Sequence, residues 1–285
     1  MKRITESLSV SRSNLYERKK RDCCSSRRVR YHKAEDKRLL PIIREIVDER
    51  PTYGYPRATA LLNRRLRVLG RPRVNHKRVY RIMKGNGLLL ERHVGGPRRV
   101  HEGEIVTAES NRRWCSDIFE IACWNGEQVR VTFAMDCCDR EVMSYLASTS
   151  GISGEMIRDL MTEAIEARFG LVDRLPYRIE WLSDNGPAYT ASETRNFAAC
   201  VGLVACTTPK ESPESNGMAE AFIKTFKRDY VALHRLDHAQ VVLEQLPEWF
   251  RDYNENHPHR GLKMMSPKEY RQSLTPLTEC PVSWG

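Results

Sequence analysis

The chain lacks the features that mark membrane, secreted and zinc-binding proteins. Its 285 residues contain no apolar run near the length of a membrane span, about 18 residues, and they begin without a secretory signal. No Cys-x-x-Cys pair and no histidine pair at zinc-ligand spacing is present, nor is a Ser-His-Asp or Cys-His arrangement evident for nucleophilic catalysis. The sequence therefore predicts a cytoplasmic protein that neither enters a membrane nor binds zinc.

Cysteine is present, but it forms no disulfide pattern. The count is odd and includes two adjacent pairs, so a regular set of bridges is not indicated. In a reducing compartment such residues are expected to be small side chains of the core. The nine cysteines are Cys23, Cys24, Cys115, Cys123, Cys137, Cys138, Cys200, Cys206 and Cys280.

Positive charge is concentrated in the first third of the chain. Residues 1–100 contain 28 Lys and Arg against 9 Asp and Glu, whereas residues 101–285 contain 19 against 28. A balance of +19 followed by −9 favours a polyanionic partner for the first third, because basic residues release counterions from a polyanion. The alternative is a basic surface that serves only solubility. The length itself suits about two domains.

A small helical region is expected at residues 35–90. An apolar stripe at helical spacing predicts a first helix, and Pro41 implies that its regular part starts nearby or bends there. A second helix is expected after the break at residues 51–56. The preceding residues 1–34 are predicted to be a basic arm or an incomplete helix-turn-helix.

The third helix of this region is the candidate for DNA recognition. Asn75 is a suitable N-cap for it, and the helix is expected to end at Gly85-Asn86-Gly87. Its apolar residues Val79, Ile82 and Met83 would face inward. A basic third helix suits a helix-turn-helix that enters the major groove, although a solvated basic helix is the alternative. The residues expected to contact DNA are Lys77, Arg78, Arg81 and Lys84.

Residues 111–275 are expected to form a second domain of a different kind. Residues 91–110 before it have the Gly-rich, polar composition of a linker, and residues 276–285 would be a tail. Three short strands, the first two joined at Asn125-Gly126, precede an alternation of helices and strands. This order predicts an α/β fold whose mixed sheet is flanked by helices.

Two acidic residues of this domain have contrasting local structures. Asp184 follows a short apolar run and precedes Asn185-Gly186, a pattern that predicts a residue at the open end of a strand. Glu220 lies near the start of a predicted helix, and Lys224 and Lys227 share its polar face. Because 35 residues separate Asp184 from Glu220, the two belong to different elements that could meet at one metal ion.

A third acidic residue is needed for a metal site, and Asp117 is the preferred candidate. It lies between bulky residues in a strand expected to be central, where an unpaired charge is costly. Asp136 and Asp139 are rivals that Arg140 is expected to neutralise through a salt bridge. His257 and His259 follow a helix and flank a proline, so a turn is preferred to a metal pair.

Three carboxylates with few nitrogen donors favour Mg²⁺ or Mn²⁺ over zinc, because hard ions prefer oxygen ligands. Two such ions about 3.5–4 Å apart can activate an attacking oxygen and stabilise a leaving oxygen in phosphodiester chemistry. The acidic residues therefore predict metal-dependent chemistry on a phosphodiester.

Together these segments carry a specific resemblance. Trp114 to Asp117, Leu182-Ser183-Asp184-Asn185-Gly186, and Ser212-Pro213-Glu214-Ser215-Asn216-Gly217-Met218-Ala219-Glu220 with Lys227 resemble the D,D-35-E catalytic core of retroviral integrases and bacterial insertion-sequence transposases. Tyr53-Gly54-Tyr55 and Val74–Gly87 resemble the helix-turn-helix before such cores, and Tyr253-Asn254 through Ser266-Pro267 resembles their C-terminal end. The chain resembles an OrfB-type transposase of the IS-three family, in its IS-two subgroup.

The resemblance implies an RNase H-like fold in which Asp117, Asp184 and Glu220 meet at the sheet edge and bind two Mg²⁺ or Mn²⁺ ions. Water would nick DNA at an element end, and the freed 3′-OH would attack another phosphodiester without a covalent protein intermediate. In this family the first transfer joins the two element ends through one strand and forms a circular intermediate. Asn185, Lys224 and Lys227 would contact the DNA, although the two lysines could simply form a solvated helix face.

The same resemblance bears on partners. Joining two ends implies a homo-oligomer, at least a dimer, bound to element-end and target DNA. The short start predicts an upstream DNA-binding partner or a frameshifted fusion with one. Two other functions stay open at this point, a catalytically idle DNA-binding regulator and an RNase H-like nuclease. We expect a bacterial, cytoplasmic, DNA-associated protein.

Overall fold

The structure is a computed structural model that describes residues 34–91, 107–207 and 217–274. The expected N-terminal arm, most of the expected linker, the first five residues of the motif that ends at Glu220 and the expected tail lie outside the described residues. The chain divides into two compact units between Glu45 and Ile46. Each unit is described by itself, and the predicted domain boundaries stay predictions.

The first described helix, α3, runs from Ala34 to Glu49. The expectation that its regular part starts near Pro41 is wrong, because the helix includes this proline and begins well before it. Proline lacks a backbone N–H and so removes one hydrogen bond from a helix interior. The hydrogen bonds of the other turns are sufficient to continue this 16-residue helix past the one that Pro41 cannot make.

Two further helices follow, α4 from Tyr55 to Val68 and α5 from His76 to Gly85. The apolar residues predicted to face inward on α5 are buried. Asn75 caps α5 as predicted, since its side chain accepts a hydrogen bond of 2.9 Å from the backbone N–H of Lys77. Asn63 of α4 fixes the connection by two bonds with the backbone of Val74, of 3.0 and 2.7 Å. The predicted helical arrangement of this region is confirmed.

The second domain is built on a five-stranded mixed sheet with the order β3-β2-β1-β4-β5. β1 pairs antiparallel with β2, which pairs antiparallel with β3, while β1 with β4 and β4 with β5 are parallel. The first strand of the domain is therefore central, as expected. The strands are β1 Arg113–Ala122, β2 Gln128–Asp136, β3 Val142–Ser148, β4 Ile179–Ser183 and β5 Leu203–Thr207.

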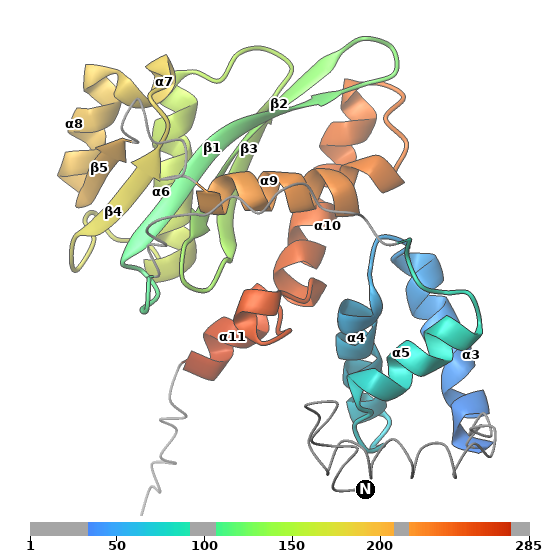
Figure 1. Cartoon of the computed structure of the whole chain (residues 1–285). Coiled ribbons are helices and arrows are strands. Elements are labelled where there is room, and N and C mark those ends of the chain that lie inside the picture. The colour runs from blue at the N-terminus through green and yellow to red at the C-terminus, as the bar shows by residue number, and fades with distance from the viewer. Residues whose placement is uncertain (1–33, 92–106, 208–216, 275–285) are drawn as a thin grey trace, which may run out of the picture. The chain divides into compact units, whose positions relative to one another are not determined.

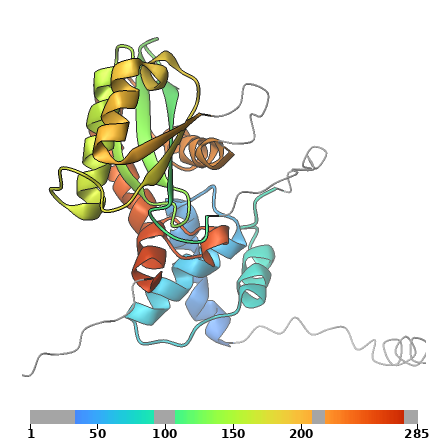
Figure 2. The ribbon, with the colours of Figure 1, turned by 90° about the vertical axis from the view of Figure 1, so that its left-hand side faces the viewer.

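Helices cover both faces of this sheet, because alternate strand residues are apolar on both sides. Figure 2 shows α6 and α8 on one side and α9 on the other. The helices on the first side are α6 Gly154–Phe169, α7 Pro187–Thr190 and α8 Ser192–Val201, and those on the second are α9 Gly217–Asp229 and α10 Ala239–Asn256. The predicted mixed sheet flanked by helices is confirmed.

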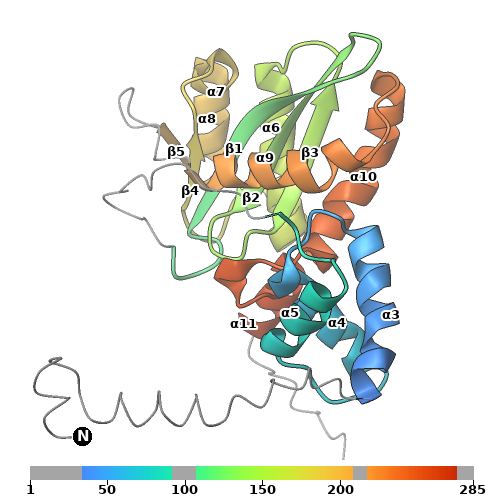
Figure 3. The same cartoon turned by 45° about the vertical axis from the view of Figure 1, so that its right-hand side comes forward.

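Helix α9 crosses the central strands through aromatic contacts (Figure 3). The ring of Phe222 lies 4.4 Å from that of Phe133 on β2, and the ring of Phe226 lies 5.8 Å from that of Phe119 on β1. Burial of each such side chain contributes roughly 1.5–3 kcal/mol relative to exposure. These contacts hold the start of α9, with Glu220, over the middle of the sheet.

The chain after α9 contains elements that the sequence patterns did not predict. Two 3₁₀ turns occur, η2 at Val231–Leu233 and η3 at Arg260–Leu262, and a last helix, α11, spans Pro267–Leu274. A capping box begins α11: Glu269 N–H donates to Ser266 Oγ at 3.2 Å, and Ser266 N–H donates to Glu269 Oε2 at 3.0 Å. The Ser-Pro-Lys-Glu spacing could have predicted this helix.

The cysteines only partly follow the expectation for core residues. Cys115, Cys123, Cys137 and Cys138 are buried free thiols, whereas Cys200 is exposed. The exposure of Cys200 reflects its position near the outer end of α8, and the prediction is wrong for this residue. In the described ranges, no helix is both long and apolar enough to cross a membrane.

Candidate active site

Asp117 lies on the sheet face that α9 covers. Side chains alternate along a strand, and its neighbours two positions away, Cys115 and Phe119, pack with α9 and α10. The carboxylate is half-buried, and its Oδ1 accepts a hydrogen bond of 2.8 Å from the backbone N–H of Ile118. The central strand thus directs this acid toward the helix that carries Glu220.

Asp184 follows the last residue of β4, as predicted, on the strand next to Asp117. The parallel register pairs Trp114 with Trp181 and Cys115 with Leu182. Continuing this register by two residues places Asp184 beside Asp117 and on the same face as Leu182. The sheet therefore brings together two acids that are far apart in sequence.

A tight turn holds the Asp184 side chain. Its Oδ1 accepts a hydrogen bond of 3.0 Å from the backbone N–H of Gly186, the pattern of an Asx turn. A Cβ at residue 186 would lie only 3.0 Å from this oxygen, so glycine leaves room for the turn. Asn185, between them, is exposed at the surface of the turn.

Glu220 lies in the first turn of α9, where the helix dipole favours an acidic side chain. Its side chain is half exposed and lies 3.7 Å from the ammonium group of Lys224, four residues later. Lys227 is exposed on the same helix, with its Nζ 5.8 Å from the centre of the Phe119 ring. The predicted polar face of α9 is thus present and solvent-accessible.

The three acids influence one another electrostatically. Burial, together with the charges of Asp184 and Glu220 and against the opposing hydrogen bond from Ile118 N–H, raises the pKa of Asp117 to about 6. The carboxylates therefore face a common space. In the part of the chain that the structure describes, however, no three His, Cys, Asp or Glu side chains are gathered closely enough to hold one metal ion.

The donor chemistry nevertheless fits a divalent cation. All three groups offer carboxylate oxygens, which hard ions such as Mg²⁺ and Mn²⁺ prefer. A bound cation would offset the burial and the neighbouring negative charges that raise the pKa of Asp117. The carboxylate of Glu220 is half exposed in the first turn of α9 and would be accessible to such an ion.

The rival acids Asp136 and Asp139 have structural contacts. Asp136 is buried and accepts backbone hydrogen bonds from Asn111, Cys138 and Asp139. Asp139 binds both guanidinium nitrogens of Arg168, at 2.8 and 3.0 Å.

The expected salt bridge of these acids to Arg140 is wrong. Arg140 adopts a positive φ of 61°, and its guanidinium group lies against Gly261, where no Cβ would fit. Arg168, from α6, takes its place because the end of that helix reaches the loop after β2. The partner comes from a distant element, and so adjacency in sequence gave no sign of it.

The helix expected to contact DNA presents its basic side chains to solvent. Lys77, Arg81 and Lys84 of α5 are exposed, whereas Arg78 is half-buried. The apolar side of the helix packs inward through Val79. This polarity suits a surface that binds a polyanion.

His257 and His259 lie in the connection after α10, and both side chains are buried. His257 Nδ1 lies 2.7 Å from the hydroxyl of Tyr53. Burial lowers the pKa of His257 well below its usual value, and burial with the nearby charge of Arg140 lowers the pKa of His259 to about 3. Both imidazoles are therefore neutral at physiological pH.

This burial predicts a defined acid sensitivity. An unfolded histidine has a pKa of about 6.5, so below that pH the unfolded chain binds a proton that folded His259 does not. The stability contributed by neutral His259 is present above the unfolded pKa and is lost as the pH falls. The loss is about 2 kcal/mol between pH 7 and pH 5. Urea unfolding at both pH values should show His259→Gln to be less acid-sensitive than the wild type by this amount. An equal loss in both proteins would contradict the assignment.

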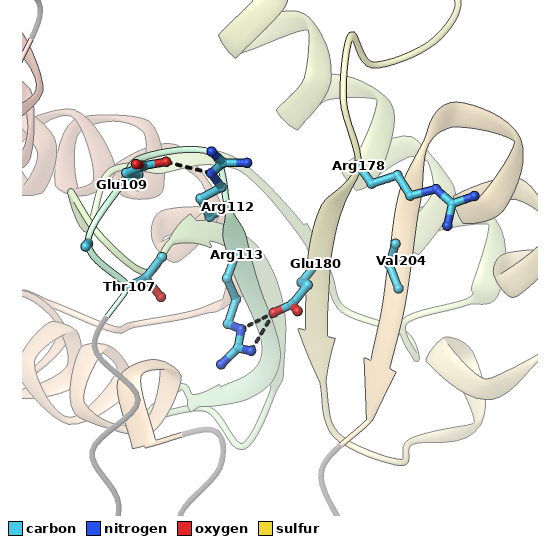
Figure 4. Close-up of a pocket in the computed structure, with 8 residues that line it drawn as sticks. Thr107, Glu109, Arg112, Arg113, Arg178, Glu180 and Val204 are labelled. Carbon is cyan, nitrogen blue, oxygen red and sulfur yellow. Dashed lines mark hydrogen bonds and ion pairs between the residues drawn. The ribbon is translucent and has the colours of Figure 1, made fainter.

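A pocket of about 540 Å³ lies at the other end of the same sheet face (Figure 4). Its walls include Arg113 of β1 and Glu180 of β4, which are register partners joined by an ion pair of 2.5 Å, and Val204 of β5. Arg112 and Arg178 add further positive charge. None of the three predicted catalytic acids lines it, and the sequence patterns did not single out these arginines.

Comparisons with known proteins agree with this architecture. A family model described as "HTH-like domain" matches residues 34–94, and two described as "Integrase core domain" match residues 107–213 and 205–267. The chain is 46% identical over 272 residues to transposase InsD for insertion element IS2A/D/F/H/I/K of Escherichia coli, covering 94% of this chain and 89% of the relative. Transposase InsD for insertion element IS2-9 of strain K12 is also 46% identical over 272 residues, with coverage of 94% and 87%.

A solved structure shows the same fold. A chain of the simian T-cell lymphotropic virus intasome in complex with PP2A regulatory subunit B56 gamma aligns with a TM-score of 0.50 and 19% identity. The alignment covers 78% of this chain and 76% of that chain. At this identity the likeness concerns the fold alone.

Proposed function

Since the chain belongs to the InsD transposases of insertion element IS2 and is therefore a DNA transposase, we propose that it joins DNA strands by metal-dependent phosphoryl transfer at Asp117, Asp184 and Glu220. The observation that carries this proposal is electrostatic. Asp184 and Glu220, from separate elements, both raise the pKa of Asp117 on one face of the central sheet. A carboxyl group whose pKa is raised by burial and by neighbouring acids is typical of a functional site.

In this proposal the three carboxylates hold Mg²⁺ or Mn²⁺. When bound, two ions would activate the attacking oxygen and stabilise the leaving oxygen of a phosphodiester. Asp117 and Asp184 provide a rigid base, since one lies on the central strand and the other in an Asx turn beside it. Glu220 completes the site from the start of α9.

The chemistry consists of two displacements at phosphorus. A water oxygen first forms a bond to the phosphorus at an element end, while the bond to the 3′ oxygen breaks and that oxygen leaves as a 3′-OH. This 3′-OH then attacks a second phosphodiester and displaces its 3′ oxygen, so no net bond is lost in the second step. The resemblance to the IS-three family favours the other element end as the first target, with a circular product.

Side chains around the acids would orient the DNA. Lys224 and Lys227 present ammonium groups on the exposed face of α9, and Asn185 is exposed at the turn after Asp184. Positive charge near the scissile phosphate attracts the backbone without reading its sequence. We propose that these three residues hold the phosphates on either side of the reacting bond.

DNA binding itself is a property of the family, and α5 is the proposed contact helix. We expect Lys77→Gln combined with Lys84→Gln to weaken element-end binding and to reduce the slope of log K against log salt by about 2, because each phosphate contact contributes about 0.9. Fluorescence anisotropy over a series of KCl concentrations measures this slope. Lys268→Gln, an exposed lysine paired with Glu255 at 2.8 Å, is the matched control. An unchanged slope in the double variant would mean that α5 is a solvated basic helix and does not contact DNA.

We propose further that the active form is at least a dimer, because two element ends must meet. A strand-joining assay with Mg²⁺ on DNA that carries two paired ends tests both the chemistry and this requirement. Repeating it with and without an upstream DNA-binding partner, or with a fusion to one, shows whether the chain acts alone.

A further inference from the structure

A buried tyrosine lies directly behind the acidic site. Tyr189 belongs to α7, the short helix that follows Asp184, and its side chain is 4% exposed. Its hydroxyl lies 2.7 Å from Ser116 Oγ on β1 and 3.1 Å from Thr132 Oγ1 on β2. Ser116 and Thr132 are fully buried. The three hydroxyl groups therefore form a small polar cluster within an apolar layer.

These hydroxyls satisfy one another. A phenol can donate one hydrogen bond and accept another, and so can each alcohol. An unpaired buried hydroxyl is unfavourable, because it loses its bonds to water without replacing them. Burial also raises the pKa of Tyr189 above its usual value, so the phenol keeps its proton. The contact of Tyr189 with Ser116 and Thr132 therefore depends on the tyrosine hydroxyl and not only on its ring.

On one side, this contact is connected to Asp184 by a continuous series of hydrogen bonds. The backbone N–H groups of Tyr189 and Thr190 both donate to the carbonyl of Gly186 at 3.1 Å. The hydroxyl of Thr190 donates to the same carbonyl at 3.1 Å. Gly186 N–H in turn donates to Asp184 Oδ1. Residues 184–190 are thus one compact unit, and the position of Tyr189 determines where this unit lies against the sheet.

On the other side, the contact ends next to Asp117. Ser116 precedes Asp117 on the central strand, and adjacent strand residues point to opposite faces. Tyr189 therefore reaches the strand from the α6 side, while Asp117 points to the α9 side. The tyrosine touches neither carboxylate, yet it fastens the segment that carries one to the strand that carries the other.

We propose that Tyr189 is a positioning residue that sets the separation of Asp117 and Asp184 through its hydrogen bonds to Ser116 and Thr132. This inference rests on the proposed function, since the separation matters only if the two acids bind metal. The parallel ladder between β1 and β4 stops at Cys115 and Leu182, two residues before the acids. Beyond that point, the hydrogen bonds of Tyr189 to Ser116 and Thr132 replace the ladder in holding the segment of Asp184 against β1.

The test is the metal affinity of the full-length Tyr189→Phe protein. Phenylalanine keeps the ring in its apolar layer and removes only the hydroxyl. We expect Mn²⁺ affinity, measured by calorimetry with Mn²⁺ alone, to fall about 10-fold, as is common when a residue that orients a metal ligand is changed. Raising the Mn²⁺ concentration should restore strand joining in this variant but not in Asp184→Asn.

Tyr253→Phe is the matched control. Tyr253 is also buried in the same domain, but its hydroxyl contacts Met135 Sδ, at 3.9 Å, on the α9 side of the sheet. Its Mn²⁺ affinity should equal that of the wild type. Thr132→Val keeps the side-chain shape and removes the hydroxyl that faces Tyr189. This change should also lower the Mn²⁺ affinity. Combined with Tyr189→Phe, it should cause no further loss. If Tyr189→Phe does not fold, Thr132→Val decides the question.

The outcomes separate the two proposals. Wild-type affinity in Tyr189→Phe, or in Thr132→Val if only that variant folds, overturns the positioning role while the metal site stands. A wild-type chain whose Mn²⁺ binding is absent, or is unchanged by Asp184→Asn, overturns the proposed site and this inference with it. An equal loss in Tyr253→Phe would show a general effect of core tyrosines and would also overturn the positioning role.

Discussion

Asp184→Asn is expected to abolish strand joining while the protein stays folded. The amide has the size of the carboxylate, and its oxygen can still accept the hydrogen bond from Gly186 N–H, so the Asx turn is kept. What is lost is one negative charge beside Asp117. A metal ion contributes several kcal/mol to phosphoryl transfer, and each 1.36 kcal/mol is tenfold in rate, so we expect a loss of about 1,000-fold or more.

The measurement is the yield of joined strands from paired element ends in Mg²⁺, with circular dichroism as the check on folding. Asp159→Asn is the matched control, because Asp159 is exposed on α6, on the opposite side of the sheet. It should join strands at the wild-type rate. Full activity in Asp184→Asn would mean that the acidic site is assigned to the wrong residues.

The same assay separates the other two functions considered from the sequence. A wild-type chain that binds element ends but cuts no DNA in either Mg²⁺ or Mn²⁺ would be a catalytically idle regulator. Degradation of RNA–DNA hybrids without any joined product would indicate an RNase H-like nuclease. Membership of the InsD transposases favours joined products over both outcomes.

Arg168→Met is expected to produce the largest loss of stability among single changes distant from the acids. The guanidinium of Arg168 is 1% exposed and the carboxylate of Asp139 is fully buried. Ser110 also donates to Asp139, at 2.7 Å, and Glu141 lies 3.3 Å from the arginine. Removing the arginine leaves the Asp139 charge buried without its cation, which costs about 3–5 kcal/mol.

Urea unfolding of the wild type and the variant measures this loss. Arg130→Met is the matched control, since Arg130 pairs with Glu120 at 2.8 Å on the exposed part of the sheet. An exposed pair of this kind contributes at most about 1 kcal/mol. Combining Arg168→Met with Asp139→Asn should recover part of the loss, because the buried charge is removed. A loss in Arg168→Met no greater than in Arg130→Met would contradict the role of the buried pair.

Local patterns in the sequence were sufficient for most elements of the core. The three opening strands, the first two joined at Asn125-Gly126, and the alternation of helices and strands that follows occur in the predicted order. Strand alternation and the helical stripe of α9 are set by neighbours in the chain, so the sequence contains them directly. The sequence likewise predicted a strand for Asp117, expected to be central, and the polar face of a helix for Glu220.

Other features depend on which elements pack together, and a local pattern cannot specify them. Arg168 is 29 residues from Asp139, and Tyr189 is 73 residues from Ser116. The burial of His257 and His259 likewise follows from the packing after α10, not from the residues beside them. In each case the partner is chosen by the fold, because contacts of this range form only when separate elements meet.

The sequence by itself therefore determined the type of fold, the family resemblance and the elements that carry each predicted catalytic acid. Only the tertiary structure decided that the strand register places Asp184 beside Asp117, that α9 brings Glu220 over the same face, and that a buried hydroxyl fastens the segment of one acid to the strand of another. The physical reason is range. Periodicity is a property of adjacent residues, whereas the separation of two charges is a property of the packed sheet.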